Sequence, residues 1–526
     1  MAEYDLMQHQ REGVDFLDRV DGVGALLYDP GVGKTGVALT WIDNLAQKRP
    51  NREVRVLVIA PLTAADTWVF QAPMFMDSVV KARLLQGSTK SILKAVRSAR
   101  NWTDVPSTKV FSDHPGIRRT QVSGNRVTIL SLSAGAISSF CSTPDRRVQM
   151  LRAIRAYKPD VVVVDESQII KTAGANISKS AYQIGQLAPH RLILTGTVTP
   201  LSPLDVYGQW RFLAPWTFSD QHGFSYTDNP SRMTQFQVAE IRPWSWTRFK
   251  DRYSEPGGYK NKGIGGFKNL DELNSRVAER AHVVLKADAL DLPPVQDVDV
   301  HVTLSPKEAA AYQQMKDELA MELTNGELLE APNALAKMMK LRQIASGFVK
   351  DTETGEIHII GDSLRKSVKE VCQVTLETEK RIVVFAYFRA ECERLADMLR
   401  QRGTTVEVVT GSTKADERLA IRKRFGDVSG NPERIILVAQ QRTMSVSVNE
   451  LVTAQNAVFA SMSERREDWV QARGRLDRNG QKGQHVTFWN VMSPGLIGEI
   501  MRDRHEDRGD LESALLNHIM SATPVR

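Results

Sequence analysis

The sequence has 526 residues and a mass of 58.8 kDa, several times the usual size of one domain, so it can form more than one hydrophobic core. Hydrophobic residues make up 42% and charged residues 25% of the chain, which excludes disordered and low-complexity classes. The net charge of +7 favours a polyanionic partner without identifying one.

Short β-branched runs alternate with helical patterns in the first part of the chain. Continuous apolar runs are typical of strands buried on both faces of a parallel sheet. The predicted strands are residues 25–28, 56–59, 127–130, 161–164 and 192–194. Residues 207–267 break this pattern and are rich in aromatic side chains, which we expect mainly to fill a helical subdomain. The alternative is that some of them stack on exposed bases, and residues 244–250 are the candidate because basic and aromatic side chains interleave there.

The alternation resumes in the second part of the chain. Its boundary is marked by Leu292-Pro293-Pro294, because paired prolines stop regular structure. A strand-like segment, residues 298–304, precedes a helix that Ser305 caps and that runs to about residue 323. The further predicted strands are residues 381–387, 406–409, 435–438, 457–459 and 486–489. The sequence therefore predicts an α/β protein with two lobes and a mixed middle section.

The first chemical signal is the loop from Asp29 to Thr35, which follows an apolar strand and precedes a helix. Gly31 and Gly33 let backbone N–H groups surround phosphate oxygens, Lys34 reaches the β and γ phosphates, and Thr35 can ligate Mg²⁺. Tyr28 stands where the strict phosphate-loop pattern has its first glycine. The loop predicts ATP and Mg²⁺ as cofactors.

Two adjacent carboxylates, Asp165 and Glu166, end the run of valines at residues 161–164. At the carboxyl end of a parallel strand, Asp165 can hold Mg²⁺ and Glu166 can deprotonate the attacking water. Further signals are Thr195-Gly196-Thr197 after the next strand and the arginines Arg475 and Arg478 near the end of the second lobe. If residues 471–481 are helical, the two arginines share one face and can present two guanidinium groups to a triphosphate.

These motifs together resemble superfamily 2 helicases and, within them, the Swi/Snf-type DNA translocases. The matching residues are Leu6, Gln10 and Gly13 in the opening motif, residues 58–61 with Trp68, residues 194–197, 212–215, 341–343 and 410–413 with Arg418, Phe425, and Gln471, Gly474, Arg475, Arg478, Gly480 and Gln481. Three further segments resemble the Swi/Snf-type proteins that remodel forks and reanneal strands: Arg252-Tyr253, residues 269–273 and residues 291–294. The likeness extends from Leu6 to about Trp489.

The resemblance implies two RecA-like lobes that hydrolyse ATP while tracking along DNA. The implied segments are 1–215 (first lobe), 216–291 (aromatic-rich connector), 292–361 (linker and helices), 362–493 (second lobe) and 494–526 (helical tail). The resemblance implies that Gln10 and Gln471 bind the nucleotide and that Arg475 and Arg478 are catalytic. It also implies a group of coupling or DNA-binding residues, namely Gln168, Thr195, Gly196 and Thr197.

The implied function is an ATP-dependent double-stranded DNA translocase in replication, recombination or repair, of bacterial or phage origin. Its expected partner is duplex or forked DNA, bound without base readout by a monomer. The alternatives are a strand-separating DNA or RNA helicase and a nucleotide-binding scaffold, and retention of the catalytic residues disfavours the scaffold. The three cysteines form no paired motif and no apolar run is long enough to span a bilayer, so we expect a cytoplasmic protein without membrane contact.

The sequence also departs from the family pattern at several positions. His9 replaces a tyrosine, Gln168 replaces a histidine, Val198 replaces a proline, Val446 and Val448 replace glycines, and residues 463–466 replace an Asp-Trp-Asn-Pro stretch. The role of the family histidine must therefore be taken by Gln168 or be missing. Residues 114–119 are a further candidate phosphate-binding segment.

Overall fold

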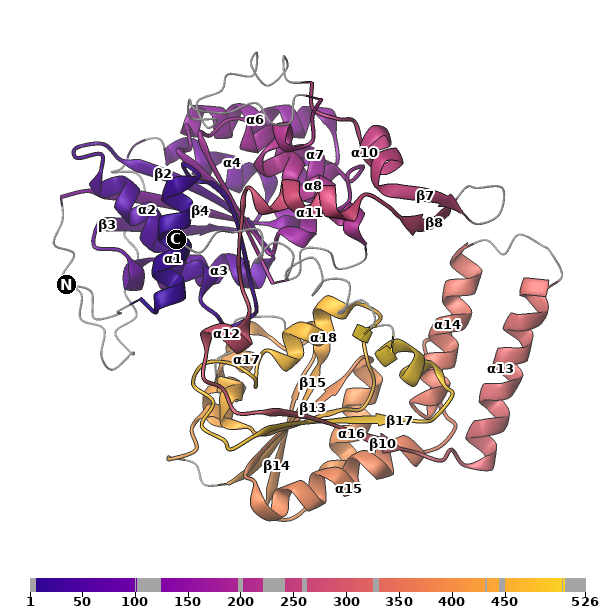
Figure 1. Ribbon diagram of the computed structural model, residues 1–526. Coiled ribbons are helices and arrows are strands. Elements are labelled where there is room, and N and C mark those ends of the chain that lie inside the picture. The colour runs from indigo at the N-terminus through magenta and orange to yellow at the C-terminus, as the bar shows by residue number, and fades with distance from the viewer. Residues whose placement is uncertain are drawn as a thin grey trace. The chain divides into compact units, whose positions relative to one another are not determined.

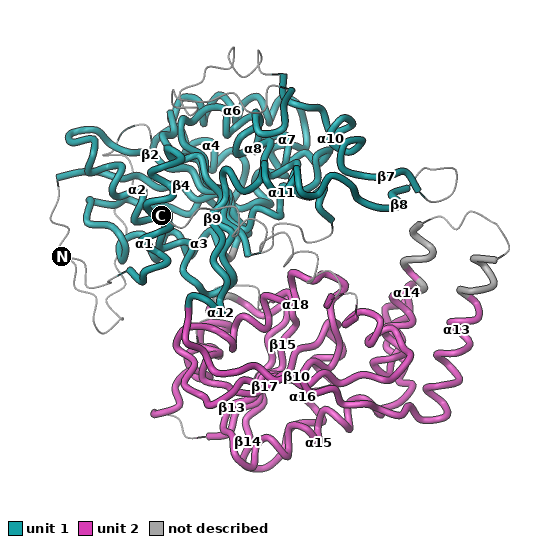
Figure 2. Tube along the Cα trace, viewed as in Figure 1, with its two compact units in different colours: residues 1–289, 510–526 teal, residues 290–509 magenta. Residues whose placement is uncertain are grey.

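The computed structural model describes residues 6–99, 101, 124–196, 202–220, 242–257, 263–324, 331–430, 433–443, 450–503 and 505–506. The chain divides into two compact units, and the change from the first to the second falls between Ala289 and Leu290 (Figure 2). The expected finer boundaries at residues 215, 361 and 493 stay predictions. Two candidate segments, residues 114–119 and residues 444–449 with Val446 and Val448, lie outside the described residues.

A parallel sheet of seven strands forms the centre of unit 1 (Figure 1). In sheet order the strands are β3 (Val79–Leu85), β4 (Arg126–Ser133), β2 (Val54–Ala60), β5 (Val161–Asp165), β6 (His190–Thr195), β1 (Val23–Tyr28) and β9 (Ala281–Val284). The five strands predicted from apolar runs are confirmed, and β3 and β9 are the two edge strands that were not predicted. Because all strands run in one direction, the loops after β5, β6 and β1 emerge side by side at one edge of the sheet.

Helices cover both faces of this sheet. The described helices of unit 1 are α1 (Gln8–Arg19), α2 (Lys34–Gln47), α3 (Leu62–Phe75), α4 (Thr89–Ser98), α5 (Ala134–Phe140), α6 (Pro144–Tyr157), α7 (Asn176–Gly185), α8 (Val206–Leu213), α10 (Trp246–Tyr253), α11 (Leu270–Ala278) and α12 (Lys286–Ala289). Helices α4 to α8 pack into one apolar cluster with alternate residues of the strands, such as Leu57 and Ile59 of β2. Helices α1, α2 and α3 contact one another and the strands from the other side.

The aromatic-rich section contributes to the core of unit 1. Five of its large aromatic side chains are buried in the same apolar cluster as the sheet residues: Trp210, Phe212, Trp216, Phe249 and Tyr253. The expectation that large aromatics of this section fill a core is therefore confirmed. The expected connector, residues 216–291, is not purely helical, because it also supplies the edge strand β9 and an antiparallel hairpin of β7 (Ser254–Gly257) and β8 (Gly263–Phe267). The aromatic side chains thus join these elements to the first sheet.

The candidate base-stacking segment, residues 244–250, is also largely internal. Trp244 is buried and its Nε1 donates to Asp220 at 3.0 Å, while the Arg248 guanidinium lies over the Trp244 ring. Phe249 has no exposed surface, and Trp246 is the exposed aromatic of the segment. The interleaved pattern therefore mostly reflects one buried and one exposed helix face.

Unit 2 has a parallel sheet of six strands with helices around it. In sheet order the strands are β10 (Val295–His301), β17 (Val486–Met492), β16 (Asn456–Phe459), β13 (Arg381–Ala386), β15 (Arg434–Gln440) and β14 (Thr404–Val409). The other elements are α13 (Pro306–Thr324), α14 (Ala331–Ala345), the small hairpin β11 (Phe348–Lys350) and β12 (Ile357–Ile359), α15 (Ser363–Thr378), α16 (Arg389–Leu399), α17 (Ala415–Gly426) and α18 (Arg466–Arg473). The α/β class with two parallel-sheet lobes is confirmed.

The strand-like segment before α13 is an integral strand of unit 2. All seven residues of β10 pair in parallel register with β17, from Val295 beside Val486 to His301 beside Met492. The predicted cap of α13 is present as well, since Ser305 Oγ accepts from the Glu308 N–H and Glu308 Oε2 accepts from the Ser305 N–H at 2.9 Å.

Candidate active site

The phosphate-type loop connects β1 to α2 and has the backbone that its glycines predict. Gly31 and Gly33 have φ values of 92° and 95°, a left-handed region that side chains with a Cβ rarely adopt. A Cβ on Gly33 would lie 2.1 Å from Gln10 Nε2, so a side chain there would displace the Gln10 amide. Helix α2 begins at Lys34 without a side-chain cap, which leaves its first N–H groups available to an anion.

Gln10 and His9 hold this loop from helix α1. Gln10 Nε2 donates to the carbonyl oxygen of Val32 at 3.3 Å, and His9 Nε2 lies 3.0 Å from the same oxygen. Gln10 Oε1 accepts from the Met7 N–H at 3.0 Å. The glutamine expected to bind nucleotide therefore lies against the phosphate loop, and His9 shares that position.

Tyr28 fills the position of the missing first glycine because it is still part of strand β1. Its backbone pairs with Val284 of β9, its side chain is fully buried, and its hydroxyl lies 2.9 Å from His282 Nδ1. Burial raises the pKa of the Tyr28 hydroxyl and lowers the pKa of His282 to about 4. The tight turn therefore begins one residue later, at Asp29, whose carboxylate accepts from the Lys286 N–H at 2.8 Å.

The two predicted carboxylates lie beside Lys34. The Lys34 Nζ atom is 3.5 Å from Glu166 Oε1, and Glu166 has a left-handed φ of 49°. Asp165 accepts from Trp68 Nε1 at 2.8 Å and from the Glu166 N–H at 2.9 Å. Burial, with the charge of Glu166 adding to it, raises the pKa of Asp165 to about 6, and Lys34 acts in the opposite direction. The hydrogen bond from Trp68 was not predicted, because 97 residues separate the partners.

Gln168 joins this acid pair to the end of the next strand. Its Nε2 donates to Glu166 Oε2 at 2.9 Å, and its Oε1 accepts from Thr195 Oγ1 at 2.8 Å. Gln168 and Thr195 are both buried. A continuous series of polar interactions therefore runs from Lys34 through Glu166 and Gln168 to Thr195, across the ends of three neighbouring strands.

Gly196 follows Thr195 at a close approach of two backbones. A Cβ there would lie 2.9 Å from Pro30 Cδ and 3.2 Å from the Tyr28 carbonyl oxygen. A side chain at residue 196 would thus displace the phosphate loop. Thr197 and Val198 lie outside the described residues.

The arginines of unit 2 do not lie on a helix, contrary to the expectation. Helix α18 ends at Arg473, with Gly474 as its C-cap, and Arg475 and Arg478 follow in consecutive turns. The turns are held by Gln481, whose Nε2 donates to the carbonyl oxygens of Ala454 at 3.0 Å and Leu476 at 3.1 Å. Gln471 lies in the last turn of α18. The glycine ends the helix because it lacks helix propensity, and a three-residue spacing cannot reveal this.

Models of two protein families match the chain. The model of the SNF2-related domain matches residues 9–347, well over half of the sequence, and the model of the helicase conserved C-terminal domain matches residues 365–480.

The chain belongs to the SNF2-related family.

It is therefore a helicase-like ATPase of superfamily 2, and the family resemblance and the enzyme class predicted from the motifs are confirmed. Among its relatives, the protein designated p41 of Acyrthosiphon pisum secondary endosymbiont phage 1 is 24% identical over 69% of this chain and 68% of its own length. An uncharacterized ATP-dependent helicase of Mycoplasma genitalium is 23% identical over 94% of this chain.

A third relative is the SWI/SNF-related matrix-associated actin-dependent regulator of chromatin subfamily A-like protein 1 of Xenopus laevis, 22% identical over 91% of this chain. The chain spans only 40% of the length of the Mycoplasma genitalium and Xenopus proteins. Among solved structures, the Sulfolobus solfataricus SWI2/SNF2 ATPase core in complex with dsDNA has 17% identity and a TM-score of 0.39, over 97% of this chain and 92% of that one.

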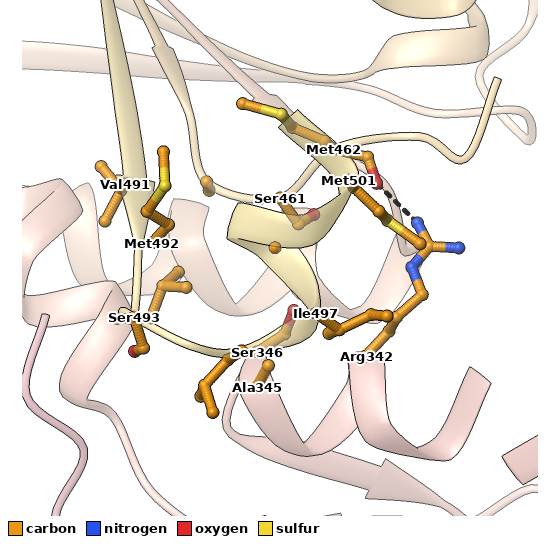
Figure 3. Close-up of a pocket in the computed structure, with 14 residues that line it drawn as sticks. Arg342, Ala345, Ser346, Ser461, Met462, Val491, Met492, Ser493, Ile497 and Met501 are labelled. Carbon is orange, nitrogen blue, oxygen red and sulfur yellow. Dashed lines mark hydrogen bonds between the residues drawn. The ribbon is translucent and has the colours of Figure 1, made fainter. Parts of the chain in front are cut away.

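The stretch that departs from the SNF2-related pattern, residues 463–466, is anchored by side chains from elsewhere in unit 2. Arg342 donates to the Met462 carbonyl oxygen at 2.6 Å (Figure 3). It also donates to Glu464 at 2.8 Å, and its guanidinium lies 3.8 Å from the centre of the Tyr387 ring. Ser463 Oγ donates to Asp468 in helix α18 at 2.8 Å. The stretch thus keeps a defined backbone without the family's tryptophan and proline.

An apolar cavity of about 40 Å³ lies beside this stretch (Figure 3). It is lined by Arg342, Ala345, Ser346, Leu364, Ala460, Ser461, Met462, Val491, Met492, Ser493, Leu496, Ile497, Gly498 and Met501. The cavity is too small for a nucleotide, whose binding pockets measure several hundred Å³. It is therefore a packing defect among methionines and not the ATP site.

Proposed function

We propose that the chain is an ATP-dependent translocase that moves on duplex or forked DNA as a monomer, in replication, recombination or repair. The observation that supports this most is the series of polar interactions from Lys34 to Thr195, which links a phosphate loop to an acid pair and to the next strand end. Its bacterial or phage source, cytoplasmic location and membership of the fork-remodelling branch are parts of the same proposal. No helix in the described part of the chain is long and apolar enough to cross a membrane.

Lys34, Glu166 and the loop N–H groups divide the work of phosphoryl transfer between them. The N–H groups at the start of α2 bind phosphate oxygens and Lys34 offsets their charge. Glu166, held by Gln168, accepts a proton from the attacking water. Arg475 and Arg478 of unit 2 stabilise the charge on the transferred group, and Gln10 and Gln471 contact the nucleotide.

Thr35 and Asp165 fit a magnesium site. Mg²⁺ prefers a hydroxyl or one or two carboxylates, with phosphate oxygens and water as the remaining ligands. Burial, and after it the charge of Glu166, raises the pKa of Asp165, and a divalent cation beside the two carboxylates would offset both effects. The described residues contain no cluster of three or more metal-ligating side chains, so the protein would supply few of the ligands. When bound, Mg²⁺ supplies charge neutralisation of the phosphates.

The experiment that tests the proposal is the steady-state ATPase rate without polymer and with single-stranded DNA, duplex DNA, forked DNA or RNA at one salt concentration. We expect duplex or forked DNA to stimulate hydrolysis most. Stimulation by RNA alone would exclude a DNA translocase.

Strand separation is the second candidate activity, and the β7–β8 hairpin favours it. The hairpin lies outside the main sheet and Ile264 on it is 45% exposed, so it could act as a small wedge. A triplex-displacement assay beside a duplex-unwinding assay separates the two activities. Displacement without unwinding supports translocation, and unwinding without displacement supports a conventional helicase.

Two substitutions test the assigned roles. We expect Lys34→Ala to weaken ATP binding, because it removes charge from the phosphate site, and Glu166→Gln to bind ATP normally but to lose turnover. Equilibrium nucleotide binding and single-turnover hydrolysis measure the two effects. Normal hydrolysis by Glu166→Gln would remove Glu166 from the role of base.

A further inference from the structure

The two helix layers of unit 1 differ strongly in charge. Helices α4, α5, α6 and α7 carry one carboxylate, Asp145, and eight cations: Lys90, Lys94, Arg97, Arg146, Arg147, Arg152, Arg155 and Lys179. Helices α1, α2 and α3 carry three cations and five carboxylates: Arg11, Arg19, Lys34, Glu12, Asp15, Asp18, Asp43 and Asp66. The excess positive charge of unit 1 is therefore concentrated on one layer.

The cations of this layer are largely exposed. Seven of the eight are exposed and Arg147 is half-buried. Within the described residues none of them forms an ion pair, and the one polar interaction is a hydrogen bond from Arg146 to Ser142 Oγ. By contrast, buried Asp160 at the amino end of β5 holds Arg49 and Arg52. Leaving so many like charges together costs free energy through repulsion unless an anion is bound.

The spacing of these cations makes a patch. Lys90, Lys94 and Arg97 lie at i, i+4 and i+7 on α4, so they form one stripe with steps of about 5 Å. Arg152 and Arg155 lie three residues apart on α6, which packs directly against α4. Figure 1 shows α4, α6 and α7 gathered over one side of the first sheet.

The patch is separate from the candidate active site. Its α4 part follows the edge strand β3, which two strands separate from β5 and four strands separate from β1. Helix α6 leads from Tyr157 into the start of β5, whereas Asp165 and Glu166 lie at the other end of that strand. Arg152 and Arg155 are therefore near the amino-terminal edge of the sheet, and the phosphate loop is at the carboxyl edge.

We infer that the exposed face of α4 and α6 binds the phosphate backbone of double-stranded DNA as a second DNA-binding surface, in addition to the DNA that stimulates ATP hydrolysis. This inference rests on the proposed function for its choice of DNA as the polyanion. A regular polyanion fits because the face carries cations at steps of one helical turn, has almost no carboxylates and includes no exposed aromatic side chain for base stacking. The surface adds affinity without sequence preference.

The test is equilibrium binding of a short fluorescent duplex to the full chain, without nucleotide, over a series of salt concentrations. The test variants are Lys90→Gln with Lys94→Gln and Arg97→Gln, and separately Arg152→Gln with Arg155→Gln. The matched control removes three exposed lysines of unit 2: Lys307→Gln, Lys366→Gln and Lys380→Gln. Thermal unfolding and ATP binding without DNA check that each variant is folded.

We expect the triple substitution on α4 to weaken duplex binding about tenfold. It should also reduce the slope of the logarithm of the binding constant against the logarithm of the salt concentration, by about 0.9 for each phosphate that is no longer neutralised. The control should leave the slope nearly unchanged. An equal effect of the control would show a general charge effect and overturn the inference, as would unchanged binding by both test variants. Weaker binding to anionic lipid vesicles with unchanged DNA binding would also overturn it, in favour of a membrane surface.

These outcomes are distinct from failure of the proposed function. If duplex DNA binds through α4 and α6 but does not stimulate hydrolysis, the proposed translocase is wrong and the second DNA-binding surface stands. If duplex DNA stimulates hydrolysis and the variants bind it normally, only the second surface is wrong.

Discussion

Gln168 is a residue at which the sequence departs from the family pattern, because it stands in place of a histidine. A histidine can carry a charge near neutral pH, whereas an amide donates one hydrogen bond and accepts another at every pH. Here the amide donates to Glu166 and accepts from Thr195, so its orientation is fixed by both partners. The link between the acid pair and the Thr-Gly-Thr segment is therefore made with different chemistry.

We expect Gln168→Leu to bind ATP normally but to lose DNA-stimulated turnover on the order of 10²-fold, because Glu166 loses the donor that orients it. Gln168→His serves as the conservative control, since it can restore a donor and an acceptor. Rescue by histidine, with a new dependence of turnover on pH, would identify a positioning role. Equal activity of the leucine variant would show that the bridge is dispensable.

Asp165 gives a prediction about pH. Its pKa is raised from its ordinary value of 3.8 to about 6, so between these values the folded chain binds a proton that the unfolded chain has released. Protonated Asp165 therefore stabilises the folded chain below pH 4, and this stabilisation is lost as the pH rises to about 6. The free energy of unfolding falls by up to about 3 kcal/mol over this range. Urea unfolding of wild type and Asp165→Asn without Mg²⁺ measures this, because the amide does not titrate. Relative to the variant, the wild type should gain stability as pH falls from 6 to 4, and a constant difference would contradict the assignment.

At the scale of elements, helix α18 is fixed to the first strand of unit 2 by one side chain. Arg473 Nη2 donates to Asp297 Oδ2 at 2.8 Å, and its guanidinium lies 4.1 Å from the centre of the Phe488 ring and 4.7 Å from that of Trp469. Three elements, α18, β10 and β17, thus meet at one arginine. This anchor lies two residues before Arg475, at the start of the segment that holds the proposed catalytic arginines.

We expect Arg473→Ala to destabilise the pairing of β10 by about 2 kcal/mol, since it removes both the stacking and the charge-assisted hydrogen bond. Amide hydrogen exchange in residues 295–301 measures this as an increase of about thirtyfold. Asp297→Asn keeps the stacking and should have a much smaller effect, because Asp297 is 44% exposed. Equal exchange in wild type and Arg473→Ala would show that the strand pairing alone holds β10.

The sequence predicted those elements whose signals are local. The phosphate loop and the Asp165-Glu166 pair each follow a run of apolar residues, so spacing alone located them correctly. Strand β9 has only four residues within the aromatic section, and β3 includes Lys81 and Arg83, so neither gave a buried-strand pattern. The bonds from Trp68 to Asp165 and from Thr195 to Gln168 join residues distant in sequence and could not be predicted from local patterns.

At the scale of the whole molecule, the proposed ATP-binding residues and the proposed catalytic arginines belong to different units. Lys34 and Glu166 belong to unit 1, and Arg475 and Arg478 belong to unit 2. The proposed coupling therefore requires DNA to favour an arrangement in which both sets act on one nucleotide. Hydrolysis without DNA should be correspondingly slow.

We expect Arg478→Ala to bind ATP and DNA normally while losing on the order of 10³-fold in DNA-stimulated turnover, as arginines that complete a phosphoryl-transfer site do. ATPase rates over a DNA titration, with filter binding as the control, measure this. Arg424→Ala, on an exposed helix of unit 2, is the matched control for loss of one arginine. DNA-stimulated hydrolysis at the wild-type rate would contradict the role of Arg478.

The pairing of β10 with β17 also has a consequence for synthesis of the chain. Among the described strands of unit 2, β10 is the first to leave the ribosome and β17 is the last, with 184 residues between His301 and Val486. Until β17 appears, β10 lacks its sheet neighbour, and its unpaired N–H and C=O groups form an open edge. Unit 1 can complete its own sheet long before that, because the last described strand of that sheet ends at Val284. A ribosome that stalls within unit 2 would therefore expose a complete first sheet followed by a strand whose pairing edge is open.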